Sequence, residues 1–581
     1  MLHLKAEKGG LAVRRRIALV AFMMLFIFVF LAGKLSWDQV INGRKLARAA
    51  VQMRSQTIEL KEYPRGVILD RNGIPLTDST KDYALYAMPG VINTHYAGDG
   101  NLQAAFNRVE SLLAPYLNED TEQEIKQNLS QVRDQDRSLI RIASRLGDEE
   151  VEALLDLDIQ GVIVAPMIKR YRDDGFMAHL LGYVGPTGNS GQSGIEKSYD
   201  HILANSTAEL ELVSTVDARN TVIKGLMFKL RQEQENSRGT VALTIDKRIQ
   251  ELAETAMNRH VDRGAVVVMD IETRQVLAMA SRPGFNPYDD ISLIIASDPY
   301  STLTNRALSR YHPGSIFKIL VAAAALEEGA VTVDDYFECD GAYDFNSQVS
   351  ISCLKKEGHG RIDLTTAFTR SCNPSFIAVG EALGRNNLMK YVERFHLTDE
   401  TLQGYVADTD YSYVNIEAGP AALGNACVGQ KGVMLTPLQL TSMIATIADE
   451  GFWKAPSLVR YSVDQYGSTE VWPDQSNQKV ISLKTAAVMR QMMEKVITEG
   501  SGQSAAMQEV PIAGKTGTSQ TGTIDNSTTP PREILNAWFG GYFPAAEPRF
   551  AIVVLAEDGE SGSKDAAPVF RDIVQGMMNY Y

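Results

Sequence analysis

The sequence predicts an α+β fold for residues 236–581, preceded by a mixed α/β region over 35–235 and by one N-terminal transmembrane helix. Two observations lead to this organisation. The apolar strand candidates of the C-terminal region come from its two opposite ends, with a series of helices between them, which is typical of a sheet packed against segregated helices. In addition, the run 17–33 is uncharged and apolar over a length at the short end of what crosses a bilayer.

The size and composition of the chain indicate a globular protein of more than one domain. Its 581 residues are too many for one ordinary domain, and a hydrophobic content of 44% supplies enough apolar side chains for a sizeable core. The formal net charge of −14, from 57 basic and 71 acidic residues, argues against nucleic acid as a partner. Four cysteines are too few for a fold built on disulfides.

The N-terminal segment has the charge pattern of an uncleaved membrane anchor. Residues 1–16 end in three arginines, and the predicted span follows over 17–34. Cleavage by a signal peptidase is the competing interpretation, but Phe30 and Leu31 occupy places where a cleavage site needs small residues. Because the basic residues precede the span, we expect 1–16 in the cytoplasm and the remainder outside, in a single-pass protein of the cytoplasmic membrane.

Residues 35–235 are predicted to be a structural module. They begin with a charged helical stalk over 38–59, followed by a β-hairpin at 65–76 that contains an Asn-Gly pair. Helical periodicity covers 104–155, and Gly-rich turns with short strands are expected over 171–196. No stretch of this region groups a nucleophile with a base, so it carries no predicted catalytic residue.

The region 236–581 is predicted to contain an antiparallel sheet. It begins with a strand at 240–244, a helix at 247–261 and two buried strands at 264–270 and 275–281. Three late strands on short connections favour antiparallel pairing. Helices fill the middle, and a last helix is expected to cover the sheet. The late strands are predicted at 511–518, 536–543 and 549–556, and the helices at 315–328, 363–383, 385–395, 436–450, 484–498 and 567–578.

A serine and a lysine mark the start of a strongly apolar helix. Ser315 is followed three residues later by Lys318 and then by the run 319–326, so both polar groups are expected on one face at the first helical turn. A hydroxyl beside an amine whose charged form is disfavoured by burial suggests a nucleophile with its base. The same Ser-x-x-Lys spacing occurs at 352–355 and 561–564 in polar surroundings, so the spacing alone does not decide.

Two further motifs follow, and each occurs once in the chain. Ser371-Cys372-Asn373 is predicted to be a loop between helices, because a helical stretch precedes it and a proline follows. Lys515-Thr516-Gly517-Thr518 begins or lies along a strand, where the glycine is expected to leave room for a substrate backbone at a sheet edge. The three motifs in this order form the set known from penicillin-binding proteins and class A β-lactamases.

Around these motifs the chain resembles class B penicillin-binding proteins, the membrane-anchored monofunctional transpeptidases of bacterial cell-wall synthesis. The resemblance covers almost the whole length and includes the Arg-Gly-x-Ile-x-Asp-Arg-Asn-Gly pattern at 65–73. The chain departs from the family at Gly429-Gln430-Lys431, where Gly-Gln-Gly is usual, and at His312. The first departure concerns the flexibility of a loop more than catalysis. The other shared segments are 178–182, 194–196, 305–307 and 436–439.

The resemblance implies a serine D,D-transpeptidase that cross-links peptidoglycan stem peptides and is acylated by β-lactams. Ser315 would attack the carbonyl of the penultimate D-Ala, with Lys318 as general base. Ser371 would relay a proton between Lys318 and Lys515, and Asn373 would bind the substrate amide. Lys515 would supply positive charge near the substrate carboxylate and keep Lys318 from holding a proton.

The resemblance also assigns the rest of the site and the surroundings of the enzyme. The hydroxyls of Thr516 and Thr518, on either side of Gly517, would bind the substrate carboxylate, and the N–H groups of Ser315 and Thr518 would form the oxyanion hole. Residues 35–235 would be a non-catalytic pedestal of the dimerisation type. A polytopic membrane glycosyltransferase is the implied partner, and no metal or organic cofactor is implied. Elongation, division and sporulation roles all stay open.

The cysteines leave two alternatives open. Cys339 and Cys353 flank a predicted hairpin of an exported domain, and either a disulfide or two free thiols fits this position. A zinc site made of these two cysteines and His359 lacks an evident fourth ligand. Cys372, inside the Ser-x-Asn motif, is interpreted as a small buried thiol.

Other functions share part of this pattern. A β-lactamase would need fast deacylation and fits poorly with an anchor and a module of this size. A D,D-carboxypeptidase resembles the chain less outside the motifs, and a bifunctional synthase would need a glycosyltransferase signature that we do not find in the sequence. A non-catalytic β-lactam sensor or scaffold is disfavoured because Ser315, Lys318, Ser371, Asn373 and Lys515 are all in place.

Overall fold

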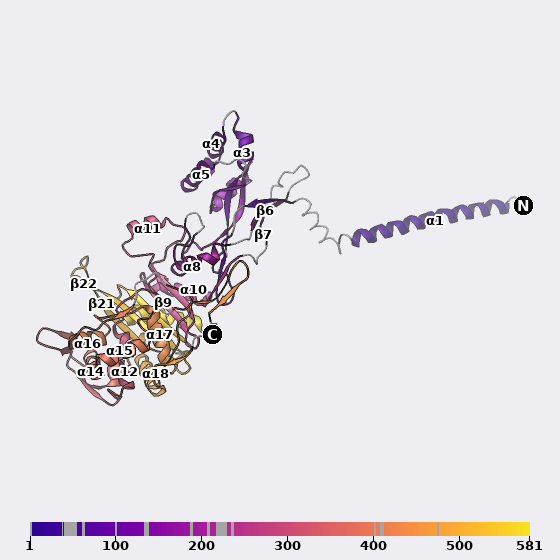
Figure 1. The fold of residues 1–581 in the computed structure, drawn as a ribbon. Coiled ribbons are helices and arrows are strands. Elements are labelled where there is room, and N and C mark those ends of the chain that lie inside the picture. The colour runs from indigo at the N-terminus through magenta and orange to yellow at the C-terminus, as the bar shows by residue number, and fades with distance from the viewer. Residues whose placement is uncertain are drawn as a thin grey trace. The chain divides into compact units, whose positions relative to one another are not determined.

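The computed structural model divides into two compact units that interleave along the chain, which Figure 1 colours by residue number. Residues 63–81 and 168–208, from the region predicted as a pedestal, pack with the C-terminal region. Unit 1 comprises Met1–Glu62, Asp82–Met167 and Glu209–Gln234, and unit 2 comprises Tyr63–Lys81, Ile168–Ala208 and Glu235–Tyr581. The structure describes residues 3–37, 39, 55–60, 64–78, 80–98, 101–132, 139–157, 159–185, 190–205, 209–215, 229–233, 238–399, 402–406, 412–472 and 476–580.

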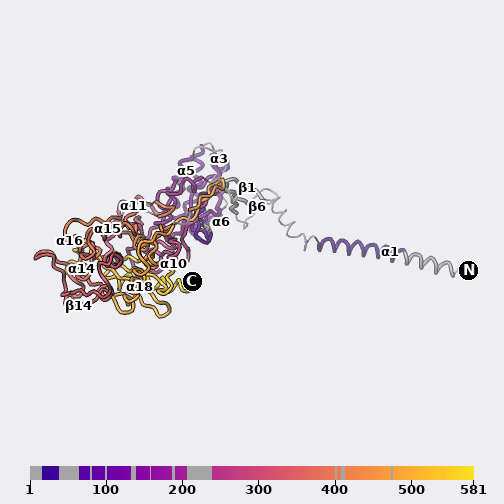
Figure 2. Tube along the Cα trace, turned by 60° about the horizontal axis from the view of Figure 1, so that its bottom comes forward, coloured from indigo at the N-terminus to yellow at the C-terminus, as the bar shows by residue number. Residues whose placement is uncertain are grey.

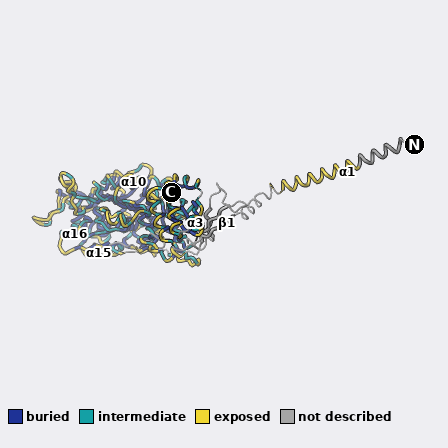
Figure 3. Tube along the Cα trace, turned by 90° about the horizontal axis from the view of Figure 1, so that it is seen from above, coloured by how far each residue is buried: buried dark blue, intermediate teal, exposed yellow. Residues whose placement is uncertain are grey.

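Helix α1 (His3–Ser36) contains the predicted membrane span. Within the described chain, its segment Arg16–Ser36 is the one helix long and apolar enough to cross a membrane. The side chains of this segment are exposed, including Phe22 and Phe28, and Figure 3 shows the exposed stretch. A helix that is apolar on all sides is stable in an apolar surrounding, so Arg16–Ser36 is a candidate membrane-spanning helix at the place of the predicted span.

Unit 1 contains a small sheet with helices packed on it. The strand order is β4-β3-β5, and α4 and α5 bury Phe106, Val109 and Ile125 in a common core with the strands. The predicted helical stretch 104–155 is largely confirmed, but β4 interrupts it. The bounds are β3 (Thr80–Ala87), β4 (Ile140–Ala143), β5 (Val162–Lys169), α3 (Pro89–Tyr96), α4 (Leu102–Leu113), α5 (Glu119–Gln131) and α6 (Asp148–Leu155).

A second sheet of unit 1 corrects one prediction. Its order is β1-β6-β7, in which β1 (Ser55–Leu60) pairs antiparallel with β6 (Glu209–Thr215) and β6 pairs with β7 (Lys229–Glu233). The end of the segment expected as a helical stalk over 38–59 is therefore a strand, and residues 40–54 lie outside the described residues. The partner strand lies far along the chain, so the pairing leaves no local signal in the sequence.

The predicted hairpin at 65–76 is confirmed and belongs to unit 2. Leu69 forms an antiparallel bridge with Pro75, and the N–H of Asp70 donates to the carbonyl of Ile74 at 2.8 Å. Strand β2 (Val67–Leu69) also pairs in parallel with β8 (Thr240–Leu243). The stretch 171–196 differs from the prediction, because it contains short helices rather than strands. These helices are α7 (Ala178–Leu181) and α8 (Gly194–Ser198), followed by α9 (Asp200–Leu203).

One buried carboxylate joins these N-terminal segments within unit 2. Glu196 is fully buried and accepts hydrogen bonds from Nε of Arg65 at 2.6 Å and from Nε of Arg170 at 2.5 Å. The Tyr171 hydroxyl donates to the same carboxylate at 2.9 Å. Burial opposes ionisation of Glu196, but the two guanidinium groups outweigh it and lower its pKa. Removal of either arginine would leave the buried carboxylate with a single guanidinium partner and a weaker opposition to its desolvation.

The predicted antiparallel sheet forms the centre of unit 2. Its order is β10-β9-β23-β22-β21, and every neighbouring pair is antiparallel, so strands from both ends of the region lie side by side. This arrangement confirms the α+β fold class. The bounds are β9 (Gly264–Asp270), β10 (Val276–Arg282), β21 (Ala513–Asp525), β22 (Arg532–Phe543) and β23 (Phe550–Glu557).

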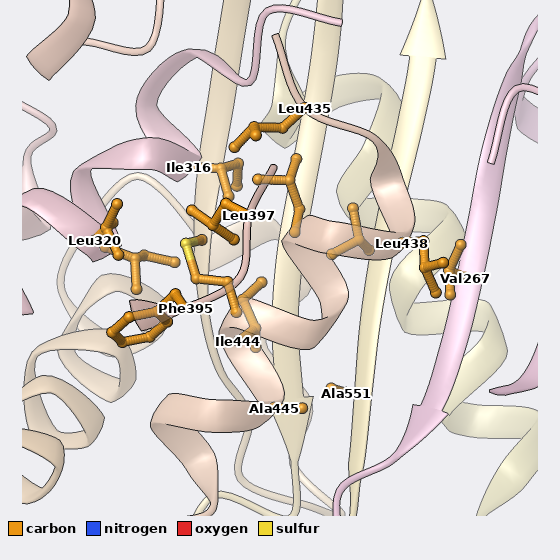
Figure 4. Packing of buried hydrophobic residues seen from close by; sticks show 14 of the residues in the cluster. Val267, Ile316, Leu320, Phe395, Leu397, Leu435, Leu438, Ile444, Ala445 and Ala551 are labelled. Atoms are coloured by element: carbon orange, nitrogen blue, oxygen red, sulfur yellow. The ribbon is translucent and has the colours of Figure 1, made fainter. Parts of the chain in front are cut away.

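Helices cover both faces of this sheet. On one face, α10 (Lys247–His260) and α19 (Ala567–Met577) share a core with the strands. On the other face lies α17 (Pro437–Ala448), in which Leu438 packs beside Val267 of β9 and Ile444 extends into the core (Figure 4). Because both faces are buried, the strands read as apolar runs rather than as alternating patterns.

The helical layer beyond α17 carries most of the candidate site. Helices α14 and α16 lie side by side in it, as Figures 1 and 2 both show. The stretch predicted as one helix over 363–383 is two helices with a turn between them. The helices of this layer are α12 (Lys318–Glu327), α13 (Leu364–Thr369), α14 (Asn373–Leu383), α15 (Arg385–Arg394), α16 (Pro420–Cys427) and α18 (Leu483–Thr498).

Short elements complete the described part of unit 2. One helix, α11 (Ile291–Ser297), carries exposed apolar side chains, and small two-stranded sheets surround the helical layer. Strand β18 joins β8 and β2 in a mixed sheet. The strands are β11 (Tyr336–Cys339), β12 (Ala342–Asp344), β13 (Ser350–Ser352), β14 (Gly360–Asp363), β15 (Tyr413–Val414), β16 (Val433–Met434), β17 (Phe452–Trp453), β18 (Val459–Val463), β19 (Thr469–Val471) and β20 (Gln478–Lys479).

Candidate active site

Ser315 lies in a tight turn just before α12. The turn, Gly314–Phe317, is a 3₁₀ helix, so Ser315 precedes the α-helix instead of lying in its first turn as predicted. Gly314 has a φ of 55°, and a Cβ at this position would lie 2.7 Å from the Thr518 carbonyl oxygen of β21. The turn and the strand are therefore in backbone contact. Ser315 itself is only half-buried.

A second glycine supports the turn from the opposite side. The Gly314 N–H donates to the Gly429 carbonyl at 2.9 Å. Gly429 has a φ of 71°, and a Cβ there would lie 2.0 Å from the Gly314 carbonyl oxygen, so no other residue fits without rearrangement. Lys431, where the resembled family usually has its second glycine, is exposed and lies 3.8 Å from a carboxylate oxygen of Glu417. The departure from the family pattern thus falls on the surface.

Lys318 is fully buried and bonded to the Ser-x-Asn motif. As the first residue of α12, it donates from Nζ to the Asn373 Oδ1 at 2.7 Å, to the Ser371 carbonyl at 2.9 Å and to the Ser371 hydroxyl at 3.4 Å. Its Nζ also lies 5.3 Å from the ring centroid of Phe376. Burial lowers the pKa of Lys318 to about 8, because the ammonium has lost its hydration.

The Ser371-Cys372-Asn373 motif forms the turn between α13 and α14, as predicted. Ser371 is buried and has a φ of 56°, in the left-handed region that a serine adopts at a cost of about 1–3 kcal/mol. Asn373 is the first residue of α14, and its Nδ2 donates to the Ser352 carbonyl at 2.9 Å. The surrounding contacts hold the turn in this conformation, which directs the Ser371 hydroxyl and the Asn373 oxygen toward Lys318.

Lys515 brings a second buried amine to the site. It lies on β21, which is the edge strand of the five-stranded sheet, and its side chain is fully buried. The Nζ donates to the Thr516 carbonyl at 3.2 Å and lies 5.7 Å from the ring centroid of Phe368. Burial, together with the charge of Lys318, lowers the pKa of Lys515 well below its ordinary value. The charge of Lys318 therefore disfavours the protonated form of Lys515.

The remaining motif residues divide between the two faces of β21. Thr516 is buried, and its hydroxyl is 2.6 Å from that of Ser501, whereas Thr518 is half-buried. Gly517 lies against the serine turn, because a Cβ there would be 3.1 Å from the Pro313 carbonyl oxygen and from Ile316. The missing side chain of Gly517 thus makes room for the turn, and its expected role in the approach of a substrate backbone stays a prediction.

Ser519, which is not among the predicted site residues, connects the strand to the turn. Its side chain is fully buried, and its hydroxyl donates to the His312 carbonyl at 2.6 Å. The indole N–H of Trp538 donates to the same hydroxyl at 3.3 Å. Lys515, Gly517 and Ser519 alternate along β21 and share one face, so the period of a strand was the signal that could have found this residue.

The cysteines near Lys318 are free thiols. Cys339 and Cys353 form no disulfide, and Cys372 and Cys427 are free as well. A hydrogen bond between Cys353 and Cys372 lowers the pKa of Cys353 and raises that of Cys372. A thiolate at this place favours the charged form of Lys318, against the larger effect of burial.

Comparison with protein families gives two matches that together cover most of the chain. Residues 264–575 match the penicillin binding protein transpeptidase domain, and residues 61–239 match the penicillin-binding protein dimerisation domain. The first match spans more than half of the chain and contains all three sequence motifs. The second contains the hairpin at 65–76 and the elements of unit 1 that follow it.

Individual relatives extend the similarity over nearly the whole length. Stage V sporulation protein D of Bacillus subtilis is 27% identical over 98% of this chain and 86% of its own length. Peptidoglycan D,D-transpeptidase FtsI of Escherichia coli is 27% identical over 97% of this chain and 91% of its own length. Peptidoglycan D,D-transpeptidase PbpA of Mycolicibacterium smegmatis is 33% identical over 57% of this chain and 71% of its own length.

Solved structures confirm the predicted fold. Penicillin-binding protein A of M. tuberculosis, in an acyl-enzyme complex with ceftriaxone, matches with a TM-score of 0.59 at 27% identity, over 70% of this chain and 93% of that one. The D,D-transpeptidase domain of a peptidoglycan glycosyltransferase from Eggerthella lenta has the same fold, with a TM-score of 0.60 at 22% identity over 89% of this chain and 98% of that one.

Replacement of Gly517 tests its contact with the serine turn. We expect Gly517→Ala to lower the free energy of unfolding by about 1–3 kcal/mol, because the added methyl would press on the Pro313 carbonyl and on Ile316. Gly284→Ala is the matched control, since a Cβ there meets nothing within 4 Å. Thermal unfolding of the detergent-solubilised full chain measures the difference. Equal transition temperatures for the two variants would contradict the assigned contact.

Proposed function

Because this chain belongs to the penicillin-binding protein transpeptidase family, we propose that it is a serine D,D-transpeptidase that cross-links peptidoglycan stem peptides through an acyl-enzyme on Ser315 and is acylated by β-lactams. The observation that carries the proposal is the buried, hydrogen-bonded amine of Lys318, whose pKa is lowered to about 8, three residues after a half-buried serine. The names of the similar proteins, including a solved acyl-enzyme complex with ceftriaxone, support it.

The first half of the proposed reaction forms the acyl-enzyme. The Ser315 oxygen attacks the carbonyl of the penultimate D-Ala while neutral Lys318 accepts the hydroxyl proton. The ester bond forms, and the amide bond to the terminal D-Ala breaks. The leaving amine receives its proton from Lys318 by way of the Ser371 hydroxyl, which lies 3.4 Å from Nζ. In the second half, the amine of a neighbouring stem peptide attacks the ester, and the proton returns to Ser315.

The other motif residues bind and polarise the substrate in this proposal. The N–H groups of Ser315 and Thr518 come from two segments in backbone contact, which suits an oxyanion hole, where one donor contributes about 3 kcal/mol. Lys515 provides positive charge near the substrate carboxylate. The Thr518 hydroxyl contacts this carboxylate, while Thr516 is bonded to Ser501 and positions the strand.

Asn373 keeps one binding group for the substrate. Its Oδ1 accepts from Lys318, and one hydrogen of its Nδ2 is bonded to the Ser352 carbonyl. The second amide hydrogen and a lone pair of the oxygen remain for the substrate amide. We assign Asn373 this role because its side chain is partly exposed beside Lys318.

The proposed division of the chain follows the family pattern. Residues 1–16 are a cytoplasmic tail, 17–34 the anchor, 35–235 a non-catalytic pedestal and 236–581 the transpeptidase domain. The arginines before the span support an N-terminus in the cytoplasm and an extracytoplasmic catalytic domain. The proposed partner is a polytopic membrane glycosyltransferase, for which the family resemblance is the support; co-purification of such a protein with the full chain tests it.

Acylation by benzylpenicillin tests the proposed nucleophile. We expect the full chain in detergent to gain the mass of one penicilloyl group, mapped to Ser315 by peptide analysis, and Ser315→Ala to gain none. Ser352→Ala is the matched control, because Ser352 begins another Ser-x-x-Lys copy. This variant is expected to be acylated at Ser315 like the wild type. Rapid hydrolysis of the drug without a lasting adduct would indicate a β-lactamase. If the folded protein forms no adduct and hydrolyses no drug, the proposed enzyme activity would be excluded.

The pH dependence of acylation tests the role of Lys318. With a pKa of about 8, roughly a tenth of Lys318 is neutral at pH 7 and about half at pH 8, so the acylation rate should rise roughly fivefold between them and level off above pH 9. Stopped-flow kinetics with a fluorescent penicillin measure the rate. Lys318→Arg, which keeps the charge but cannot become neutral, should abolish acylation at every pH. A flat profile from pH 6.5 to 9 would contradict Lys318 as the base.

Protease accessibility in protoplasts tests the membrane orientation. Externally added protease should digest the region after the anchor and leave an N-terminal epitope tag protected, because the basic residues before the span stay in the cytoplasm. The same digestion after lysis with detergent should remove the tag and serves as the control. Loss of the tag in intact protoplasts would reverse the proposed orientation.

A further inference from the structure

Four potential metal ligands converge beside the catalytic turn. Cys339, Cys353, His359 and Cys372 have their ligand atoms within 4.8 Å of one another, which no role in the proposed reaction requires. We propose that these residues form a Cys₃His site for one Zn²⁺ that holds the Ser-x-Asn turn in place. The sequence had suggested three of these ligands without a fourth. The structure supplies the fourth ligand, Cys372, which belongs to the Ser-x-Asn motif and follows β14 along the chain.

The spacing of the ligand atoms suits tetrahedral zinc. The His359 Nδ1 lies 3.6 Å from the Cys339 Sγ and 3.5 Å from the Cys353 Sγ. Bond lengths of about 2.3 Å to sulfur and 2.0–2.1 Å to nitrogen place two tetrahedral ligands about 3.6 Å apart. The measured contacts therefore match the edges of such a tetrahedron. Three thiols with one imidazole are a ligand set of structural zinc sites, and soft sulfur ligands disfavour magnesium and calcium.

The backbone around the site is built for this convergence. Cys339 of β11 pairs with Gly360 of β14, which brings it beside His359. The Cys353 N–H donates to the Gly341 carbonyl at 2.8 Å. Gly358 has a φ of 78°, and a Cβ there would lie 2.1 Å from the Cys339 carbonyl oxygen, so a larger residue would separate the segments. Three ligands are thus assembled by local structure before Cys372 is added.

Burial protects the thiols and fixes their direction. Cys339, Cys353 and Cys372 are at most 4% exposed, and none of them forms a disulfide. The Ser375 hydroxyl donates to the Cys372 Sγ at 3.1 Å, an outer contact of the kind that orients metal ligands. Close thiols in an exported domain are prone to disulfide formation, whereas zinc would keep all of them reduced and occupied.

The site touches the catalytic turn from two directions. Cys372 stands between Ser371 and Asn373, the two residues bonded to Lys318. On the other side, the Asn373 Nδ2 donates to the carbonyl of Ser352, the neighbour of Cys353. Metal binding would therefore fix the turn at Cys372 and the segment at Cys353 that Asn373 contacts, and would hold Ser371 in its left-handed conformation. This positioning role rests on the proposed transpeptidase function, whereas metal binding itself does not.

Metal analysis tests the site without reference to activity. The detergent-purified full chain should contain about one zinc per chain by mass spectrometry of the elements, and Cys339→Ser and Cys353→Ser should each lose most of it. Cys427→Ser is the matched control, because Cys427 is an equally buried free thiol outside the cluster and should keep the metal. Should the ligand variants fail to fold, cobalt exchanged into the wild type should show the visible absorption of tetrahedral thiolate coordination.

Different results would overturn the zinc site, the identity of the metal and the positioning role. A protein with no equimolar metal and four titratable thiols, or with a disulfide between cluster cysteines, would overturn the zinc site. Copper or an iron–sulfur cluster in its place would overturn the assignment to zinc. The positioning role is tested by chelation, which should slow acylation of Ser315 by about 10- to 100-fold in wild type, with recovery on adding zinc. An unchanged rate after complete metal loss would overturn that role and leave the transpeptidase proposal intact.

Discussion

The candidate site depends on two lysine amines that the fold buries and to whose pKa shifts no described carboxylate contributes. Lys318 and Lys515 are fully buried, and in the described part of the chain no carboxylate contributes to the pKa shift of either. An ammonium removed from water without a counter-charge loses its proton more readily, because hydration no longer stabilises the charged form. Aromatic rings and neutral oxygens lie near the two groups, and the effect of Cys372 and Cys353 on Lys318 is smaller than that of burial. The fold thus places an amine with a lowered pKa three residues after Ser315, and such a shift favours its use as a base.

In the same unit, Glu196 is a buried ionisable group whose charge is paired. This buried carboxylate is fully paired, with two guanidinium groups and a phenol hydroxyl, and its pKa is lowered despite burial. These ion pairs join the segments 63–81 and 168–208 within unit 2. The site itself contains two buried amines whose pKa values are lowered and to whose shifts no described carboxylate contributes. The contrast separates two uses of buried ionisable groups: one specifies how segments of the chain pack, and the other supplies a reactive base.

Close backbone contacts fix the position of the serine turn against the edge strand of the sheet. Gly314, Gly429 and Gly517 let the serine turn, its supporting loop and β21 approach one another without side chains between them. Ser519 then bonds the strand to the residue before Pro313. The proposed zinc site acts in the same sense on the third component, the Ser371–Asn373 turn. Each component of the site is therefore fixed by neighbours that take no part in the proposed reaction, which is how an active site keeps its geometry.

Local patterns in the sequence determined much of this protein. The apolar run predicted α1, the apolar strand runs predicted the central sheet, and the order of three motifs predicted which residues meet. Tertiary structure decided what no local pattern contains. The strand at 55–60 pairs with residues 209–215, Gly517 faces a turn formed two hundred residues earlier in the chain, and Cys372 completes a cluster whose other members precede it. Periodicity reports the surroundings of a residue along its own element, whereas these contacts join distant segments, and only the folded chain brings them within reach.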